Sequence, residues 1–107
     1  MANNIYFLKI TGSISSGKQR EFQQTVQFIF NHLPSGCFVH DLSLDVFRPN
    51  MYHLFSMWHS EEAMTIFKKS NEYQLLKGSF QTLGSYESAI TGKLADVQMF
   101  EVIEIKY

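Results

Sequence analysis

One segment, residues 37–59, constrains the fold of this chain more than any other. Residues 37–47 alternate in character, with Phe38, His40, Leu42, Leu44 and Val46 on one face and Val39, Asp41, Ser43 and Asp45 on the other. A period of two predicts a β-strand. Arg48-Pro49-Asn50 then predicts a three-residue hairpin loop, and residues 51–59 predict the return strand. The chain must therefore contain a β-hairpin.

The residues before this hairpin predict a strand followed by a helix. Residues 5–10 form a short apolar run typical of a strand, and residues 11–17 carry turn signals. Apolar residues at helical spacing predict an amphipathic helix over residues 17–33. Ser16 and Gln19 have the spacing of a capping box at its start.

The residues after the hairpin predict a helix in two segments and one more strand. Ser60 is a suitable N-cap for the first segment, Ser70 begins a second segment, and Gly84 ends it. Residues 85–93 are polar and predict a loop, and residues 97–105 predict the final strand. The element order is βαββαβ.

This order predicts an α+β, ferredoxin-like fold with an antiparallel sheet and both helices on one face. The other face needs a cover, because the third and fourth predicted strands are apolar on both sides. Their apolar residues are Tyr52, Leu54 and Trp58 against Met51, Phe55 and Met57, and Met99 and Ile103 against Phe100 and Val102. A symmetric second copy would cover that face and form a dimeric α+β barrel. The alternative is that a misread register exaggerates the apolar surface.

Length and composition narrow the class of protein. The 107 residues fit one domain, residues 1–107, and 45% are hydrophobic. A net charge of −1 without long basic runs argues against nucleic-acid binding, and no apolar run is long enough to span a membrane. One cysteine, Cys37, and the lack of a signal-peptide pattern predict a cytoplasmic location.

The segment from Leu54 to Ala63 resembles the strand-to-helix junction of the antibiotic biosynthesis monooxygenase (ABM) family, and residues 70–78 and 80–84 resemble the family's next segment. The resemblance implies a ligand pocket between sheet and helices. For some members it implies cofactor-independent oxygenation of an electron-rich aromatic compound, or haem degradation.

The residues at the family's reactive positions differ from those of its known chemistries. Leu54 and Met64 stand where polyketide-oxidising members place an Asn and a Tyr. Phe67 and Lys77 stand where haem-degrading members place a Trp and a His, and only Trp58 matches. We therefore expect no haem, other cofactor or metal.

The candidate catalytic residues are His40 and Trp58. If the hairpin sets the register symmetrically, these two residues face each other on the helix-covered side, where the imidazole could act as a base. The alternatives are a hydrogen-bonded core histidine and a tryptophan that only packs. The expected pocket-lining residues are Tyr52, Leu54, Met64, Phe67 and Tyr73.

The other histidines and the cysteine favour structural roles. The same register pairs His53 with Asp45 on the opposite face as a cross-strand ion pair, although a functional role stays open. His32 lies near a helix C-terminus, and Cys37 is expected to be a small buried residue. No spacing typical of a zinc site or a phosphate-binding loop occurs.

Two functions follow. The first is a cofactor-independent monooxygenase that acts as a homodimer on a small aromatic or quinone-like compound. The second is a non-catalytic dimeric module that binds a small hydrophobic ligand, because apolar side chains at the reactive positions have little means to move protons.

Overall fold

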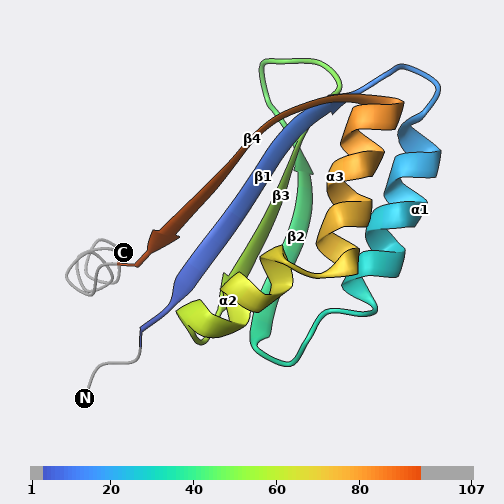
Figure 1. Ribbon diagram of the computed structural model, residues 1–107. Helices are drawn as coiled ribbons and strands as arrows, with labels where there is room; N and C mark the ends of the chain where they lie inside the picture. The colour runs from blue at the N-terminus through green and yellow to red at the C-terminus, as the bar shows by residue number, and fades with distance from the viewer. Residues whose placement is uncertain (1–3, 95–107) are drawn as a thin grey trace.

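The computed structural model describes residues 4–94, which form a four-stranded antiparallel sheet with three helices on one face (Figure 1). The strands are β1 (Tyr6–Ile14), β2 (Cys37–Leu44), β3 (Met51–Trp58) and β4 (Gly84–Lys93), in the order β2-β3-β1-β4. The helices are α1 (Gln19–Phe30), α2 (Glu61–Lys68) and α3 (Asn71–Leu83). The predicted ferredoxin-like α+β class is confirmed. The prediction of one domain over residues 1–107 stays a prediction.

The predicted loop over residues 85–93 is wrong, because these residues are the edge strand β4, which pairs with β1. An edge strand has water along one side and on part of its faces, so it can carry the polar residues that suggested a loop. The final strand predicted at residues 97–105 lies outside the described residues.

The start of the chain also differs from its prediction. β1 runs on to Ile14 through the expected turn, because its partner strands extend alongside it. A Cβ atom at Gly84, where α3 passes directly into β4, would overlap the Ser13 carbonyl oxygen. Only glycine therefore permits this close approach of the two strands.

The helix starts show which capping signals were decisive. Ser60 and Ser70 cap α2 and α3 as predicted, each accepting a hydrogen bond of 3.1 Å from a backbone N–H three residues later. The capping box at Ser16 is wrong, because α1 begins after Lys18 without a side-chain cap. Gln19 instead bonds to side chains outside its helix.

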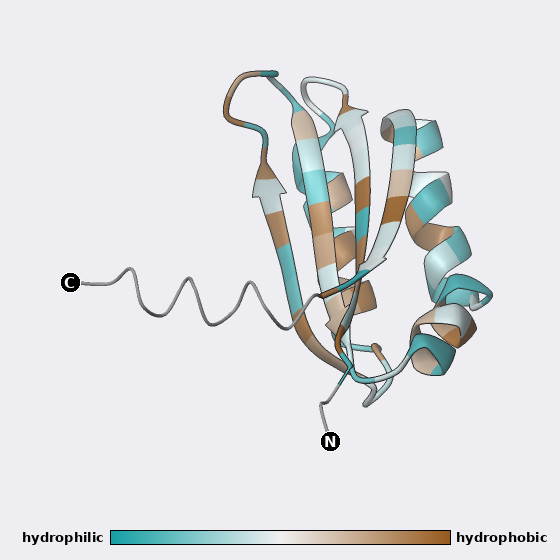
Figure 2. Ribbon diagram, turned by 90° about the vertical axis from the view of Figure 1, so that its left-hand side faces the viewer, coloured by the Kyte–Doolittle hydropathy of each residue, from teal (hydrophilic) through white to brown (hydrophobic). Residues whose placement is uncertain are grey.

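The core lies between the sheet and the helices. Phe22 of α1 occupies its centre, with its ring 4.8 Å from Phe80 and 5.1 Å from Tyr52. The opposite side of the sheet, here called the open face, has no cover among the described residues (Figure 2). Its side chains include Phe7 and Lys9 of β1, Asp41 of β2, His53, Phe55 and Met57 of β3, and Ile90 of β4.

Within residues 4–94, no helix has the length and apolar character needed to cross a membrane.

Candidate functional site

Most of the predicted pocket-lining residues are packed in the core. Leu54, Phe67 and Tyr73 are buried in the central apolar cluster, and the ring of Phe67 lies 5.2 Å from that of Trp58. Tyr52 and Met64 line two separate cavities. The structure therefore does not bring the five predicted residues together around one ligand space.

Trp58 has the environment of a packing anchor. Its side chain is fully buried, and its indole Nε1–H donates a 2.8 Å hydrogen bond to the Oγ of Ser56. The Ser56 hydroxyl in turn donates to the Leu8 carbonyl oxygen at 3.3 Å. A catalytic role for Trp58 stays a prediction, but this burial favours the packing alternative.

One cavity lies between α1 and the β2–β3 hairpin, and we call it the α1–β2 cavity. Its volume is about 360 Å³, within the range of small-molecule pockets. Its apolar lining is Val26, Phe30, Leu42 and Leu44, and its polar lining is Gln23, Gln27, Ser43 and Tyr52. Mixed walls of this kind can hold an aromatic ring and orient one or two polar substituents.

A chain of hydrogen bonds fixes the polar side of this cavity. The Gln23 side-chain amide donates to the Tyr52 hydroxyl at 3.0 Å, and that hydroxyl donates to the side-chain Oε1 of Gln19 at 3.0 Å. The Gln19 amide donates onward to the Asn50 side-chain oxygen at 2.5 Å. The Tyr52 phenol is therefore engaged in both directions and is held in one orientation.

His40 stands beside the α1–β2 cavity, but not opposite Trp58. The register pairs His40 with Ser56, so the predicted facing of His40 and Trp58 is wrong. The reason is the hairpin, whose loop begins earlier than expected: Asp45 makes the last backbone bond to Met51. The shift of two positions preserves the predicted side of the sheet.

The ring of His40 packs on Phe30, with ring centroids 4.4 Å apart. Phe30 lines the cavity, whereas His40 does not line it itself and adjoins it through this contact with Phe30. His40 is exposed, which rules out the alternative of a core histidine. An exposed imidazole near a ligand-sized space is a candidate general base.

A second cavity of about 360 Å³ lies near the start of α2 and the end of β4. Its lining is Tyr6, Glu61, Met64, Thr91, Gly92 and Lys93. Met64 is the predicted residue that reaches this space. Its two charged groups, Glu61 and Lys93, are exposed at the rim, so the cavity offers little enclosed polar chemistry.

Two further ionisable groups on the helix side are poorly suited to proton transfer. Burial, reinforced by the neighbouring Tyr86, raises the pKa of Tyr73 to about 12. Burial also raises the pKa of Cys37, so its thiol has little thiolate character.

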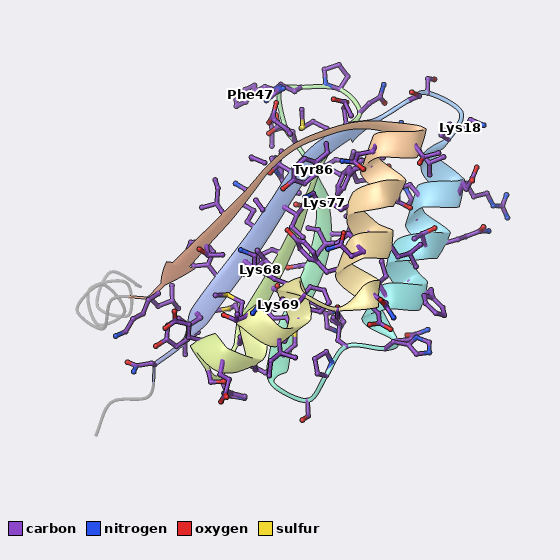
Figure 3. The ribbon with its side chains drawn as sticks, in the orientation of Figure 1. Lys18, Phe47, Lys68, Lys69, Lys77 and Tyr86 are labelled. Carbon is purple, nitrogen blue, oxygen red and sulfur yellow. The ribbon has the colours of Figure 1, made fainter. Side chains whose placement is uncertain are left out.

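Lys77 lies over the ring of Tyr86, 5.2 Å from its centroid, where it makes a cation–π contact (Figure 3).

The predicted ion pair between His53 and Asp45 is confirmed, but the predicted register is wrong, because His53 lies opposite Ser43 rather than Asp45 in the sheet. The His53 Nε2 lies 2.8 Å from an Asp45 carboxylate oxygen, and its Nδ1 lies 3.1 Å from the Thr11 hydroxyl. Three hydrogen bonds lower the pKa of Asp45 to about 2. The bond from His53 has the largest effect, and those from the backbone N–H groups of Arg48 and Phe47 have smaller effects. This group orders the hairpin and lies across the sheet from both cavities.

Sequence reasoning missed the glutamines of α1. Gln19, Gln23 and Gln27 recur every four residues and so lie on one stripe of the helix, which faces the hairpin. This repeat was available as a signal. Only the packing of α1 beside β2 showed that the stripe borders a cavity rather than water.

Comparison with known proteins agrees with this architecture. A family model described as antibiotic biosynthesis monooxygenase matches residues 5–77. No curated protein sequence matches the chain.

Several solved structures share the fold at low sequence identity. A conserved protein of unknown function from Bacteroides thetaiotaomicron has 14% identity and a TM-score of 0.72, over 87% of this chain and 100% of that chain. A conserved protein from Methanosarcina mazei has 11% identity and a TM-score of 0.68, over 86% and 91% of the two chains. A mutant of SnoaB from Streptomyces nogalater, described as a cofactor-independent oxygenase, has 15% identity and a TM-score of 0.61, over 88% and 93%.

Proposed function

The chain belongs to the antibiotic biosynthesis monooxygenase family, and on that premise we propose that it is a cofactor-independent monooxygenase for a small aromatic or quinone-like compound. We assign the substrate to the α1–β2 cavity and the role of base to His40. The observation that carries this proposal is the position of His40, stacked on a side chain that lines the cavity. The fold shared with SnoaB, described as a cofactor-independent oxygenase, supports the reaction class.

The chemistry requires a base and an enclosed aromatic ring. A phenol that loses its proton becomes electron-rich enough to give electrons to dioxygen, and the base must lie within reach of that proton. His40 supplies an imidazole at the margin, Phe30 offers a ring face for stacking, and Gln23 and Tyr52 hold polar groups at the inner wall. The substrate itself is the reductant: a ring C–H of the diphenol is replaced by a C=O that holds one oxygen atom of O₂, and the other oxygen atom leaves as water with two hydrogen atoms of the substrate, so that the four electrons taken up by O₂ all come from the substrate.

A test uses His40→Ala with His32→Ala as the matched control. His32 is an exposed histidine whose ring contacts Phe28 and the end of α1, away from the cavity. Naphthalenediol serves as the test substrate for O₂ uptake, and naphthol as the test ligand for binding. We expect His40→Ala to abolish O₂ uptake but to keep naphthol binding, and His32→Ala to retain both. Because His40 is exposed, its removal should change the melting temperature little. O₂ uptake by His40→Ala at the wild-type rate would rule out His40 as the base.

The α1–β2 cavity itself is tested by a filling substitution. Gln27 lines the cavity at an exposed position, so Gln27→Trp should occupy the space without disturbing the core. Naphthol binding measured by calorimetry should be lost in this variant. Unchanged binding would place the ligand elsewhere.

The second candidate is a non-catalytic module that binds a small hydrophobic ligand. It is favoured by the apolar residues at the family's reactive positions, since Leu54, Met64 and Phe67 are all buried in the core. Naphthol binding without O₂ uptake in the wild-type protein would select this candidate.

We also propose that the protein forms a homodimer through the open face. The rings of Phe7 and Phe55 stack there at 5.9 Å, and Ile90 is half exposed beside them. A second copy would bury these groups, and a stable pair buries at least about 1,000 Å² in total. Phe55→Asp should convert a dimer at micromolar concentration into a monomer by sedimentation analysis. A monomeric wild-type protein would contradict the barrel.

A further inference from the structure

The most exposed apolar side chains of the described residues lie together at the end of the β2–β3 hairpin. Val46 is 87% exposed and Phe47 is 91% exposed. We call residues 45–50 the hairpin tip. Figure 3 shows Phe47 directed away from α1 and α3, and in Figure 1 the tip leans away from the helix side of the sheet. The tip therefore overhangs the side of the molecule that carries the open face.

The hairpin tip is held in one conformation. One Asp45 carboxylate oxygen accepts hydrogen bonds from the backbone N–H groups of Phe47 at 2.9 Å and Arg48 at 2.8 Å. The Arg48 guanidinium makes an ion pair of 2.8 Å with Glu87 of β4, and the Asn50 carbonyl accepts from the Ile14 N–H at 2.9 Å. Two large apolar groups are thus presented on an ordered loop, so binding through them would cost little conformational entropy.

The charges of the open face indicate which partner fits. Asp41, Phe55 and Lys9 lie side by side on three neighbouring strands. Neither Asp41 nor Lys9 makes an ion pair within residues 4–94. A two-fold axis along the strands near Phe55 would place Lys9 of each copy opposite Asp41 of the other, so this row is complementary to itself.

The same axis keeps the two hairpin tips at the same end of the assembly. Because each tip bends toward the side of the open face, each would reach the other copy. A lipid surface fits less well, because interfacial segments usually carry free basic residues and Arg48 is already paired with Glu87.

We propose that the hairpin tip is a clasp that docks Val46 and Phe47 onto a second copy of this chain. This inference rests on the proposed homodimer and adds a contact beyond the open face. Val46 and Phe47 act as apolar anchors, and Asp45 with its partners keeps them in place.

The experiment compares Phe47→Ser and Val46→Ser with Ile66→Ser. Ile66 is a matched control, since it is 61% exposed on α2, away from the open face. The dimer dissociation constant is measured by sedimentation equilibrium. We expect Phe47→Ser to raise it about tenfold or more, as removal of a large interface anchor does. Val46→Ser should raise it less, and Ile66→Ser should leave it unchanged. All three positions are exposed, so the melting temperature should stay close to that of the wild type.

The outcomes separate the clasp from the dimer. If Phe55→Asp gives monomers while Phe47→Ser dimerises like the wild type, the clasp is wrong and the dimer stands. If the wild-type protein is itself a monomer, both proposals fail. Co-flotation with vesicles of phosphatidylcholine and phosphatidylserine that depends on Phe47, together with an unchanged dimer, would overturn the clasp in favour of membrane docking.

Discussion

The buried hydrogen bond between Ser56 and Trp58 provides a quantitative test of what the tryptophan does. Ser56 and Trp58 are both almost fully buried, and the indole N–H donates to the Ser56 hydroxyl at 2.8 Å. Ser56→Ala removes the acceptor and leaves a buried indole N–H without a partner. The expected loss in the free energy of unfolding is about 1–3 kcal/mol.

Trp58→Phe removes the donor and part of the ring. Its cost should stay below the roughly 3–5 kcal/mol of a truncation to Ala, because a phenyl ring still fills much of the site. In the double variant neither an orphan donor nor an orphan acceptor of this pair remains. The double variant should therefore lose less stability than the sum of the two single variants, by about 1 kcal/mol.

The assay is urea unfolding of all four proteins followed by far-ultraviolet circular dichroism, which does not depend on the single tryptophan. Additive losses would refute the reasoning, because they would mean that the two side chains do not share a hydrogen bond. O₂ uptake measured on the same four proteins adds a second readout. Uptake lost in Trp58→Phe but kept in Ser56→Ala, at similar stability, would restore Trp58 as a catalytic candidate.

Three further predictions concern the hairpin, the glycines and metal binding. In the folded protein the pKa of Asp45 is lowered from 3.8 to about 2. The ionised carboxylate therefore stabilises the fold fully at pH values above 3.8, and this stabilisation is lost as the pH falls toward 2. Asp45→Asn should therefore be less stable than the wild type near neutral pH, with a difference that shrinks in acid unfolding curves below about pH 4; a constant difference would contradict the pKa. Gly12→Ala should cost about 1–3 kcal/mol, since its Cβ would lie 2.5 Å from the Phe80 ring, whereas Gly78→Ala on open helix surface should gain about 0.5–1 kcal/mol by thermal unfolding. Haem or Zn²⁺ titrations should show no stoichiometric binding, because the chain lacks ligand-spaced histidines; a saturable Soret shift at one haem per chain would contradict this.

Local signals predicted much of the architecture correctly. The period of two in residues 37–44, together with the hairpin signal that follows it, gave both hairpin strands and the sides of the sheet on which their residues lie. Ser60 and Ser70 marked two helix starts, because their side chains satisfy backbone N–H groups within the same few residues. Each of these features depends on neighbours in the chain, so a single sequence contains the information.

The predicted site was less accurate, because it depended on distances between elements. The residues expected to line one pocket were predicted to face the space between the sheet and the helices, and they do. Whether they enclose a space or fill it depends on how closely α2 and α3 approach the sheet. Here Phe67 and Tyr73 close that space, and the α1–β2 cavity lies elsewhere, beside α1.

The sequence by itself determined the order and type of most elements, the two faces of the hairpin, the family and the proximity of His53 to Asp45. Only the tertiary structure decided that polar residues 85–93 form an edge strand, because pairing with β1 satisfies their backbone whatever their side chains are. It also decided that His40 lies opposite Ser56 and beside a cavity. The loop between β2 and β3 sets that register. This loop is held by the Asp45 carboxylate, which accepts hydrogen bonds from the backbone N–H groups of Phe47 and Arg48, and no pattern of hydrophobic residues reports such bonds.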